Sequence, residues 1–395
     1  MKVCGIIAEF NPFHFGHEHC VSAARENGAT HVVAVMSGNF VQRGGAAVCD
    51  KFARAQAALC GGVDLVLELP LPFATATAQR FAKGAVGTLH ALGCVEQLCF
   101  GSESGNTAAI AELAAAIESE AVTARLKAGL GTGLPFAAAR QAAVREVCGD
   151  SAAELLSGAN DTLAVEYAAA VNALGGKMKL HAVPRLGAAH DGAPVGGIAS
   201  ASHLRALAAE GELAAALKFM PKASADLLVR EVEAGRAPAD LRRVESASLA
   251  ALRKMSVGQL AALPDVSEGL ENRLFRAIRQ ARSTDEVIAL TKSKRYTHAR
   301  LRRILLCALL GITREIYFSE VPYIRVLAMN ARGREVLAAA KPTLPVLTRA
   351  KDKSALDKHA LDVLQLECTA DDIYALCCPT VQPCSDPFGR GIVIK

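Results

Sequence analysis

The chain has 395 residues, of which 51% are hydrophobic and 21% are charged, and its formal net charge at pH 7 is +5. This length and composition allow a sizeable core, most simply divided between two domains, and exclude intrinsic disorder as the dominant state. No stretch approaches the roughly 18 consecutive apolar residues of a membrane-spanning helix, and the first residues lack the zones of a signal peptide. We therefore expect a cytoplasmic protein with no membrane partner.

Apolar, strand-like runs alternate with helical patterns along the first half of the chain. Strands are predicted at residues 2–10, 31–38, 63–70, 95–104 and 177–187, and helices near 17–27, 50–61, 76–92 and 107–157. Nearly continuous apolar strands between helices are typical of a parallel sheet covered on both faces.

After Gly211 nearly every segment has a helical pattern. We therefore expect an α/β fold with a Rossmann-like parallel-sheet domain over residues 1–205, carrying a helical insertion near 107–157. An all-helical, locally basic domain is expected over residues 206–395.

The most informative segment follows the first predicted strand and reads GIIAEFNPFHFGHEHC, with an Asn-Pro turn before HFGH at residues 14–17. At the carboxyl end of a strand, a helix N-terminus offers backbone N–H groups to an anion such as phosphate. Gly16 would let a phosphate approach the backbone, while His14 and His17 would donate ring N–H bonds to charge developing during transfer. Two alternatives are zinc ligation by His14, His17 and His19, and ordinary helix-start histidines.

A second polar loop, MSGNFVQRGG, follows the second predicted strand. It places Ser37, Asn39, Gln42 and Arg43 at the same edge of the sheet as HFGH. Arg43 with Asn39 would clamp a carboxylate substrate beside the phosphates, and the alternative is a polar surface loop.

The positive charge is local, because residues 271–303 contain ten Arg or Lys against three acidic residues. The run KSKRYTHARLRRILL surrounds Tyr296 with Lys292, Lys294, Arg295, Arg300, Arg302 and Arg303. Positive charge around a ring that can stack suits a single-stranded RNA loop, whereas the alternative is a solvated helix face. The twelve cysteines include no CxxC pair, so we expect reduced, buried thiols and no metal site.

The position of HFGH after the first strand resembles the HxGH nucleotidyltransferase superfamily. Together with MSGNFVQRG and KRYTHARLRRILL it resembles the bacterial tRNA(Met) cytidine acetate ligase family over essentially the whole chain. The resemblance implies that acetate and ATP form acetyl-adenylate, and that the acetyl group passes to the wobble cytidine of elongator tRNA(Met). Residues 1–205 would then be the ATP-binding nucleotidyltransferase domain, and residues 206–395 the tRNA-binding domain.

The same resemblance implies a set of nucleotide-binding residues, with His14 and His17 catalytic. Mg²⁺ could accompany the nucleotide, and the sequence leaves the metal requirement open. The ATP contacts would be Ile7, Ala8, Glu9, Phe10, Asn11, Pro12, Phe13, His14, Phe15, Gly16, His17, Glu18, His19, Cys20, Gly101, Asn160 and Arg185. Gly101 would let adenosine lie against the backbone, Asn160 would cap a helix or present its amide to adenine or ribose, and Arg185 would pair with a phosphate. The segment GIASASHLR, residues 197–205, resembles a later phosphate motif of the superfamily, with Ser200 and Arg205 as its contacts.

Two other functions remain open at this stage. A small-cofactor adenylyltransferase would share the HFGH site but leaves the basic helical region without a role. A non-enzymatic, nucleotide-gated RNA-binding protein would keep both features without turnover. Acetate-dependent release of pyrophosphate separates the ligase from both.

Overall fold

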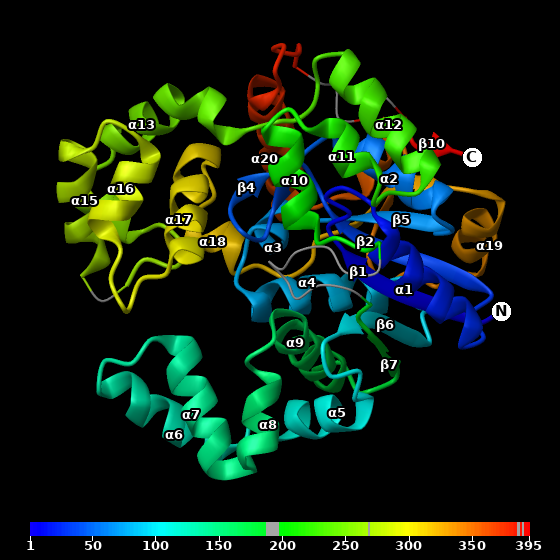
Figure 1. Cartoon of the computed structure of the whole chain (residues 1–395), viewed down its shortest axis with the longest axis horizontal. Coiled ribbons are helices and arrows are strands. Elements are labelled where there is room, and N and C mark those ends of the chain that lie inside the picture. Colours follow the sequence, from blue (N-terminus) through cyan, green and yellow to red (C-terminus); the bar gives the residue numbers. More distant parts are fainter. Residues whose placement is uncertain (187–196, 268, 385–387, 389–390) are drawn as a thin grey trace.

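The computed structural model describes residues 1–186, 197–267, 269–384, 388 and 391–395, and a sheet forms the centre of this part of the chain (Figure 1). The strand order is β10-β8-β5-β2-β1-β6-β7, with β9 beside β8. The strands are β1 (Val3–Ala8), β2 (His31–Ser37), β5 (Leu65–Leu69), β6 (Gln97–Ser102), β7 (Lys179–Pro184), β8 (Ile324–Met329), β9 (Val346–Leu347) and β10 (Val393–Ile394). A separate two-stranded hairpin joins β3 (Phe40–Val41) to β4 (Gly45–Ala46).

All five strands predicted from the sequence are present, and β5, β2, β1, β6 and β7 pair in parallel. The predicted α/β fold with a Rossmann-like parallel sheet is therefore confirmed. The final residue of the predicted strand 177–187 lies outside the described residues.

The expectation of an all-helical region after residue 205 is wrong. Strand β8 lies antiparallel to β5 and carries β9 and β10 along its other side, so the C-terminal part of the chain returns to the first sheet. The β8 segment, IRVLAM, is a short apolar run, which periodicity alone does not distinguish from part of a buried helix. The division at residue 205 stays a prediction.

Helices cover both faces of the sheet because alternate strand residues point to opposite sides. Val32 and Ala34 pack with α1 (Phe15–Glu26) and α2 (Lys51–Cys60), whereas Val33 and Val35 pack with α4 (Ala78–Ala91) and α9 (Ala159–Ala173). The predicted insertion is helical and consists of α5 (Thr107–Ala116), α6 (Glu120–Gly131), α7 (Phe136–Cys148) and α8 (Asp150–Leu155). Within the described residues, no helix has the length and apolar character needed to cross a membrane.

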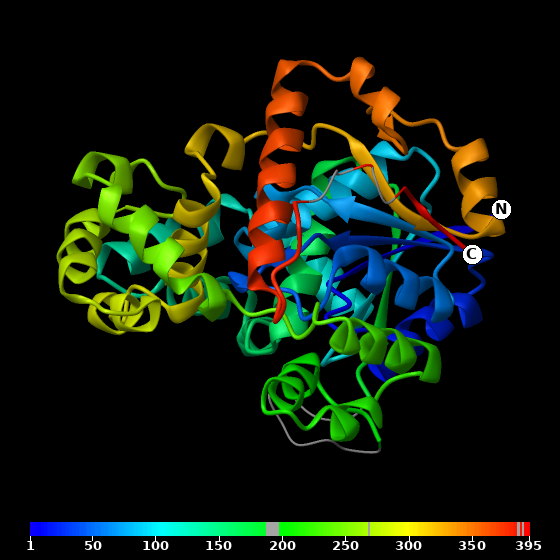
Figure 2. The same ribbon diagram turned by 90° about the horizontal axis from the view of Figure 1, so that it is seen from above.

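A second group of helices, α13–α18, lies beside the sheet and packs around an apolar core that it shares with β3, α3 and α20 (Figures 1 and 2). Its members are α13 (Glu245–Lys254), α14 (Val257–Ala261), α15 (Leu270–Gln280), α16 (Thr284–Thr291), α17 (His298–Leu310) and α18 (Arg314–Tyr317). Figure 2 shows the long helix α20 (Lys358–Cys377) between this group and the sheet. The remaining helical segments are α3 (Leu71–Ala74), α10 (Ala201–Ala209), α11 (Leu213–Leu217), α12 (Lys222–Glu233), α19 (Ala331–Ala339), and the 3-10 turns η1 (Leu241–Val244) and η2 (Ala350–Ala355).

A buried cluster of charges joins α20 to the sheet. The Lys51 ammonium donates to Glu68 Oε1 and to Asp371 Oδ2, both at 2.7 Å. The Arg325 guanidinium lies 3.2 Å from Glu68 Oε2 and 3.4 Å from Glu367 Oε2. These five side chains are all buried, so each charge depends on its partners rather than on water.

We predict that Lys51→Met lowers the free energy of unfolding by about 3–5 kcal/mol, because it leaves the buried carboxylates of Glu68 and Asp371 short of a cation. Lys83→Met is the matched control, since Lys83 pairs with Glu320 on the surface and such pairs contribute at most about 1 kcal/mol. Urea denaturation of both variants measures the difference. Equal stability of the two variants would contradict the role given to the buried cluster.

Candidate active site

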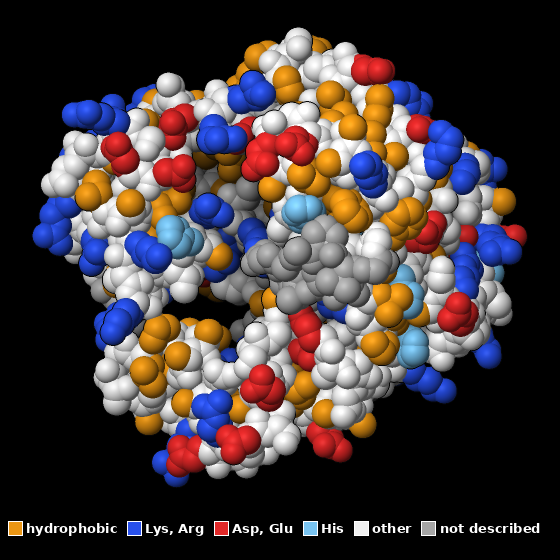
Figure 3. Space-filling view, in the orientation of Figure 1, with side chains coloured by type: hydrophobic (Ala, Val, Ile, Leu, Met, Phe, Trp, Pro, Cys, Tyr) orange, Lys and Arg blue, Asp and Glu red, His pale blue; other side chains and the backbone are white. Residues whose placement is uncertain are grey.

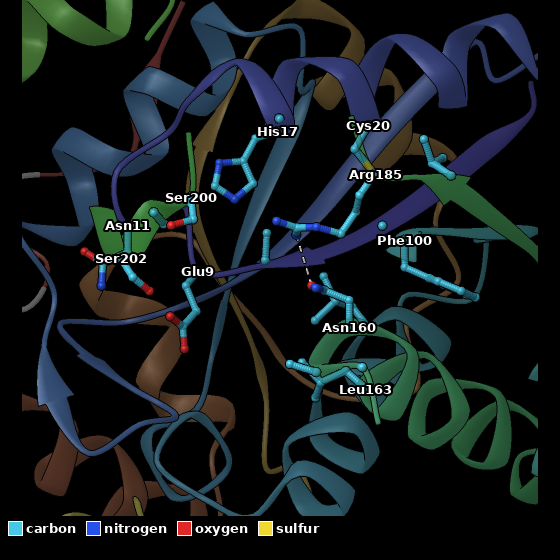
Figure 4. Close-up of a pocket in the computed structure, with 18 of the residues that line it drawn as sticks. Glu9, Asn11, His17, Cys20, Phe100, Asn160, Leu163, Arg185, Ser200 and Ser202 are labelled. Atoms are coloured by element: carbon cyan, nitrogen blue, oxygen red, sulfur yellow. Dashed lines mark hydrogen bonds between the residues drawn. The ribbon is translucent and has the colours of Figure 1, made fainter. Parts of the chain in front are cut away.

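A cavity of about 520 Å³ opens at the carboxyl ends of β1, β6 and β7, where the α/β topology predicts a ligand site (Figure 4). Its wall is formed by the end of β1, the first turn of α1, the β3–β4 turn, the starts of α9 and α10, and the end of β7. Segments far apart in the sequence therefore converge on one space.

The two histidines of HFGH hold each other in a fixed arrangement at the start of α1. The Gly16 N–H donates to His14 Nδ1 at 3.0 Å, and the His14 N–H donates to His17 Nδ1 at 3.3 Å. This reciprocal pattern is a capping box built from imidazoles. Because each Nδ1 accepts a hydrogen bond, the neutral rings carry their proton on Nε2.

Both rings are held neutral by their surroundings. Burial, helped by the Arg185 and Arg205 guanidinium groups, lowers the pKa of His14 to about 3. Burial and the neighbouring His14 likewise place the pKa of His17 well below its usual value. Since both folded pKa values lie below 6.5, the rings stay neutral at pH 7, and each offers one Nε2–H donor to an anion.

Packing also explains why position 16 is glycine, in addition to the predicted approach of a phosphate. A Cβ at this position would lie 2.8 Å from His14 Cε1 and 3.1 Å from His14 Nδ1. The glycine therefore leaves room for the capping ring.

Asn160 and Arg185 meet in the cavity, where the Arg185 side chain extends toward His17, as Figure 4 shows. Arg185 Nη1 donates to Asn160 Oδ1 at 3.2 Å, and Asn160 Nδ2 donates to Glu103 Oε1 at 2.6 Å. Asn160 is not the helix cap that the sequence suggested as one of its roles, since α9 begins at Ala159. Glu103 instead accepts the Asn160 and Asp161 N–H groups, a function that the sequence reading missed.

The later motif, residues 197–205, also reaches the cavity. Ser200 caps α10 by accepting from the His203 N–H at 3.2 Å, and Arg205 Nη1 donates to the Asn11 carbonyl at 2.8 Å. A second helix N-terminus therefore borders the same space as α1, which adds backbone donors suited to an anion.

The structure divides the predicted ATP residues into two groups. The cavity is lined by Ile7, Ala8, Glu9, Phe10, Asn11, His14, Gly16, His17, His19, Cys20, Gly101, Asn160 and Arg185. Pro12 and Phe13 do not line it, and Phe13 is part of the core beneath α1. Phe15 and Glu18 border a separate hollow on the outer side of α1.

The predicted acetate residues are divided in the same way. Gln42 and Arg43 line the cavity, and the Gln42 N–H donates to Glu9 Oε1 at 3.0 Å. Ser37 and Asn39 are buried outside it. Both ends of the Asn39 amide have protein partners, because Nδ2 donates to Asp371 and Oδ1 accepts from the Lys51 N–H. The predicted clamp of Arg43 with Asn39 is therefore not formed.

The basic segment, residues 292–306, lies in the α13–α18 group. Some of its cations are exposed to solvent, and others pair with groups of the protein. Lys292, Lys294, Arg295 and Arg302 are exposed. Arg300 donates to the Asp265 carbonyl, and Arg303 pairs with the Asp265 carboxylate at 3.4 Å. Tyr296 is only 7% exposed, so the stacking ring expected from the sequence is buried.

One wall of the cavity is apolar and was missed by the sequence reading. It includes Phe81, Phe100, Leu163 and Tyr167. These residues follow the ordinary apolar patterns of buried strands and helices, so no sequence signal separated them from the core. Within the described residues, no cluster of three or more His, Cys, Asp or Glu side chains is placed to hold a metal ion.

Comparison with known proteins agrees with this geometry. The family model described as HIGH Nucleotidyl Transferase matches residues 1–386, which places the chain in that class of protein. The tRNA(Met) cytidine acetate ligase of Syntrophomonas wolfei is 37% identical over 99% of this chain and 98% of its own length, and that of Clostridium perfringens is 36% identical over the full length of both. The crystal structure of Thermotoga maritima TmcAL bound with alpha-thio ATP superposes with a TM-score of 0.93 at 32% identity, over 100% of this chain and 99% of that one. The chain belongs to the tRNA(Met) cytidine acetate ligase family.

We predict that Gly101→Val folds normally and lowers ATP affinity at least tenfold. Among the described residues, a Cβ at Gly101 would meet only Arg185 Cγ, at 3.7 Å, so the strand tolerates a side chain that must project toward the cavity. Gly101→Ala, which adds less volume, should have a smaller effect. Calorimetric titration with ATP, alongside thermal unfolding, tests both variants, and undiminished ATP affinity in Gly101→Val would remove Gly101 from the nucleotide site.

Proposed function

We propose that this chain is an ATP-dependent tRNA(Met) cytidine acetate ligase that works through acetyl-adenylate. The observation that carries the proposal is the cavity in which two neutral, Nε2-protonated histidines lie near Arg185 and Arg205. Such fixed donors stabilise the charge that grows on phosphate oxygens as pyrophosphate departs. We propose that the protein acts in the cytoplasm.

The first half-reaction joins acetate to the α-phosphorus of ATP. An acetate oxygen forms the new bond to phosphorus, the bond to the bridging oxygen breaks, and pyrophosphate leaves with that electron pair. His14 and His17 donate to the phosphates, Arg185 and Arg205 supply positive charge, and the apolar wall of Phe81, Phe100, Leu163 and Tyr167 accommodates the adenine ring. Magnesium, where it accompanies the nucleotide, would be bound by the phosphates and would offset their negative charge.

Acetate binding is assigned to Gln42 and Arg43 alone, because Ser37 and Asn39 are buried behind them. Acetate is already an anion at pH 7, so the site needs to position it rather than to remove a proton.

The second half-reaction transfers the acetyl group to RNA. The N4 amine of the wobble cytidine in elongator tRNA(Met) attacks the acetyl carbonyl, the bond to AMP breaks, and the amine loses a proton. The exposed cations Lys292, Lys294, Arg295 and Arg302 bind RNA phosphates, whereas Arg300 and Arg303 hold Asp265 and shape the segment.

The test is incubation of the protein with ATP, isotopically labelled acetate and unmodified elongator tRNA(Met). Mass spectrometry of digested tRNA should find the labelled acetyl group on the wobble cytidine, with pyrophosphate released only when acetate is present. Pyrophosphate release that requires a cofactor precursor instead of acetate would favour the adenylyltransferase. ATP binding without any pyrophosphate release would favour the nucleotide-gated RNA-binding protein.

We predict that paired substitutions separate the two roles of His14. His14→Asn retains an acceptor near the Nδ1 position and so keeps the cap, but it lacks the distal donor, and ATP–pyrophosphate exchange should fall by about 10²–10³-fold. His14→Gln keeps a distal donor but loses the cap, so stability should fall by about 0.5–2 kcal/mol while more exchange survives. Exchange assays and thermal unfolding on both variants decide this, and wild-type exchange by His14→Asn would show that the ring serves only the cap.

A further inference from the structure

Phe318, directly after α18, is the most exposed aromatic ring in the described part of the chain. It is 59% exposed, whereas the tyrosines of this region, including its neighbour Tyr317, are buried. A single exposed apolar side chain is common on protein surfaces, so the contacts around Phe318 decide whether it marks a binding site.

The Phe318 ring is held in place by its neighbours. Its centroid lies 5.0 Å from that of Tyr317 in an edge-on contact, and the Arg80 guanidinium lies 5.6 Å from it. The Arg80 guanidinium lies 4.5 Å from the Phe73 ring and donates to the Ser319 carbonyl, while its buried Nε has no hydrogen-bond partner among the described residues. The exposed ring is therefore an ordered surface backed by a cation.

This surface adjoins the wall of the cavity. The Thr77 N–H donates to the Tyr317 hydroxyl at 3.3 Å, and the following turn of α4 places Ala78 and Phe81 in the cavity lining. Arg80 lies between these two lining residues in the sequence and turns instead toward α18. Figure 1 shows α18 beside α3 and above α4.

The space outside the cavity is suited to RNA. Figure 3 shows a hollow between the α13–α18 group and the α6–α7 hairpin, with Lys and Arg side chains around its edge. The α6–α7 turn reaches the basic segment, since a Cβ at Gly133 would lie 3.0 Å from Arg295 Nη2. The α6–α7 turn and the α13–α18 group therefore approach each other beside the hollow, and α4 contributes Ala78 and Phe81 to the cavity.

We propose that Phe318, backed by Arg80, stacks on the nucleobase that adjoins the target cytidine in the tRNA loop. The inference rests on the proposed function. For its amine to reach the adenylate, the cytidine must leave the stack of the loop, and its neighbour then loses a stacking partner. An exposed aromatic ring beside an arginine replaces that partner, because every base presents a π-face. Phe318 is a positioning residue, since it acts on the base beside the reacting one.

The chain contains no tryptophan, so Phe318→Trp introduces a single indole, whose emission is excited selectively over that of the tyrosines. Its emission should be quenched by unmodified elongator tRNA(Met), because stacking brings a base against the indole. Ile394→Trp is the matched control, being similarly exposed at 55% and lying near the C-terminus on the other side of the molecule from α18 (Figure 1). With tRNA binding verified by filter retention, unchanged emission in Phe318→Trp, or equal quenching in both variants, would overturn the inference.

Kinetics of tRNA acetylation give the second test. Phe318→Leu keeps an apolar side chain without a π-face, and kcat/KM for tRNA should fall about 5- to 150-fold, mainly through KM. Phe318→Tyr, which keeps an aromatic ring, should retain most of the wild-type kcat/KM. A merely structural role would not predict this difference between Leu and Tyr, because so exposed a ring contributes little to packing. A wild-type value of kcat/KM in Phe318→Leu would overturn this inference but not the proposed function. Absence of acetylation by the wild-type protein would instead overturn the proposed function. In that case the fluorescence test still decides whether Phe318 contacts RNA.

Discussion

Two buried cations on the first turns of α2, Lys51 and Arg54, hold the active-site edge of the sheet in place. Lys51 lies between Glu68 on β5 and Asp371 on α20. Arg54 donates to the carbonyl oxygens of Glu9, Ser37, Gly38 and Cys49, where β1 and β2 end and the next loop returns. A buried cation can remain charged only where such partners surround it, so these contacts specify one arrangement of the strand ends.

The balance of charges in the buried cluster that joins α20 to the sheet also explains why one of its carboxyl groups can be protonated. Lys51 and Arg325 pair with the three carboxyl groups of Glu68, Glu367 and Asp371, whereas Arg54 is bonded to carbonyl oxygens, so the carboxyl groups outnumber the cations that pair with them. Burial and the neighbouring Glu68 raise the pKa of Glu367 to about 7, while the pKa of Glu68, beside both cations, stays low. One carboxyl group can therefore retain a proton near neutral pH, which limits the cost of burying the cluster.

The same scaffold brings the helical group to the cavity. Asn39, fixed by Asp371 and the Lys51 N–H, precedes the β3–β4 hairpin that carries Gln42 and Arg43. In that turn Gly44 has φ of +74°, and a Cβ there would lie 2.7 Å from the Arg303 nitrogen of α17. The loop assigned to acetate and the helix carrying the basic segment are therefore in direct backbone contact, which places the two proposed half-reactions close together.

The sequence by itself determined the parallel sheet, the positions along the chain of β1, β2, β5, β6 and β7, and the position of HFGH after β1, because apolar runs and helix-start signals are local. It also indicated most of the residues that line the cavity. Only the tertiary structure decided that β8 returns to the sheet, that Asn39 and Tyr296 are buried, and that Glu103 supports Asn160 and α9. The Glu103–Asn160 contact joins residues 57 positions apart and the Asn39–Asp371 contact joins residues 332 positions apart, and no local pattern encodes which distant partner satisfies a buried polar group.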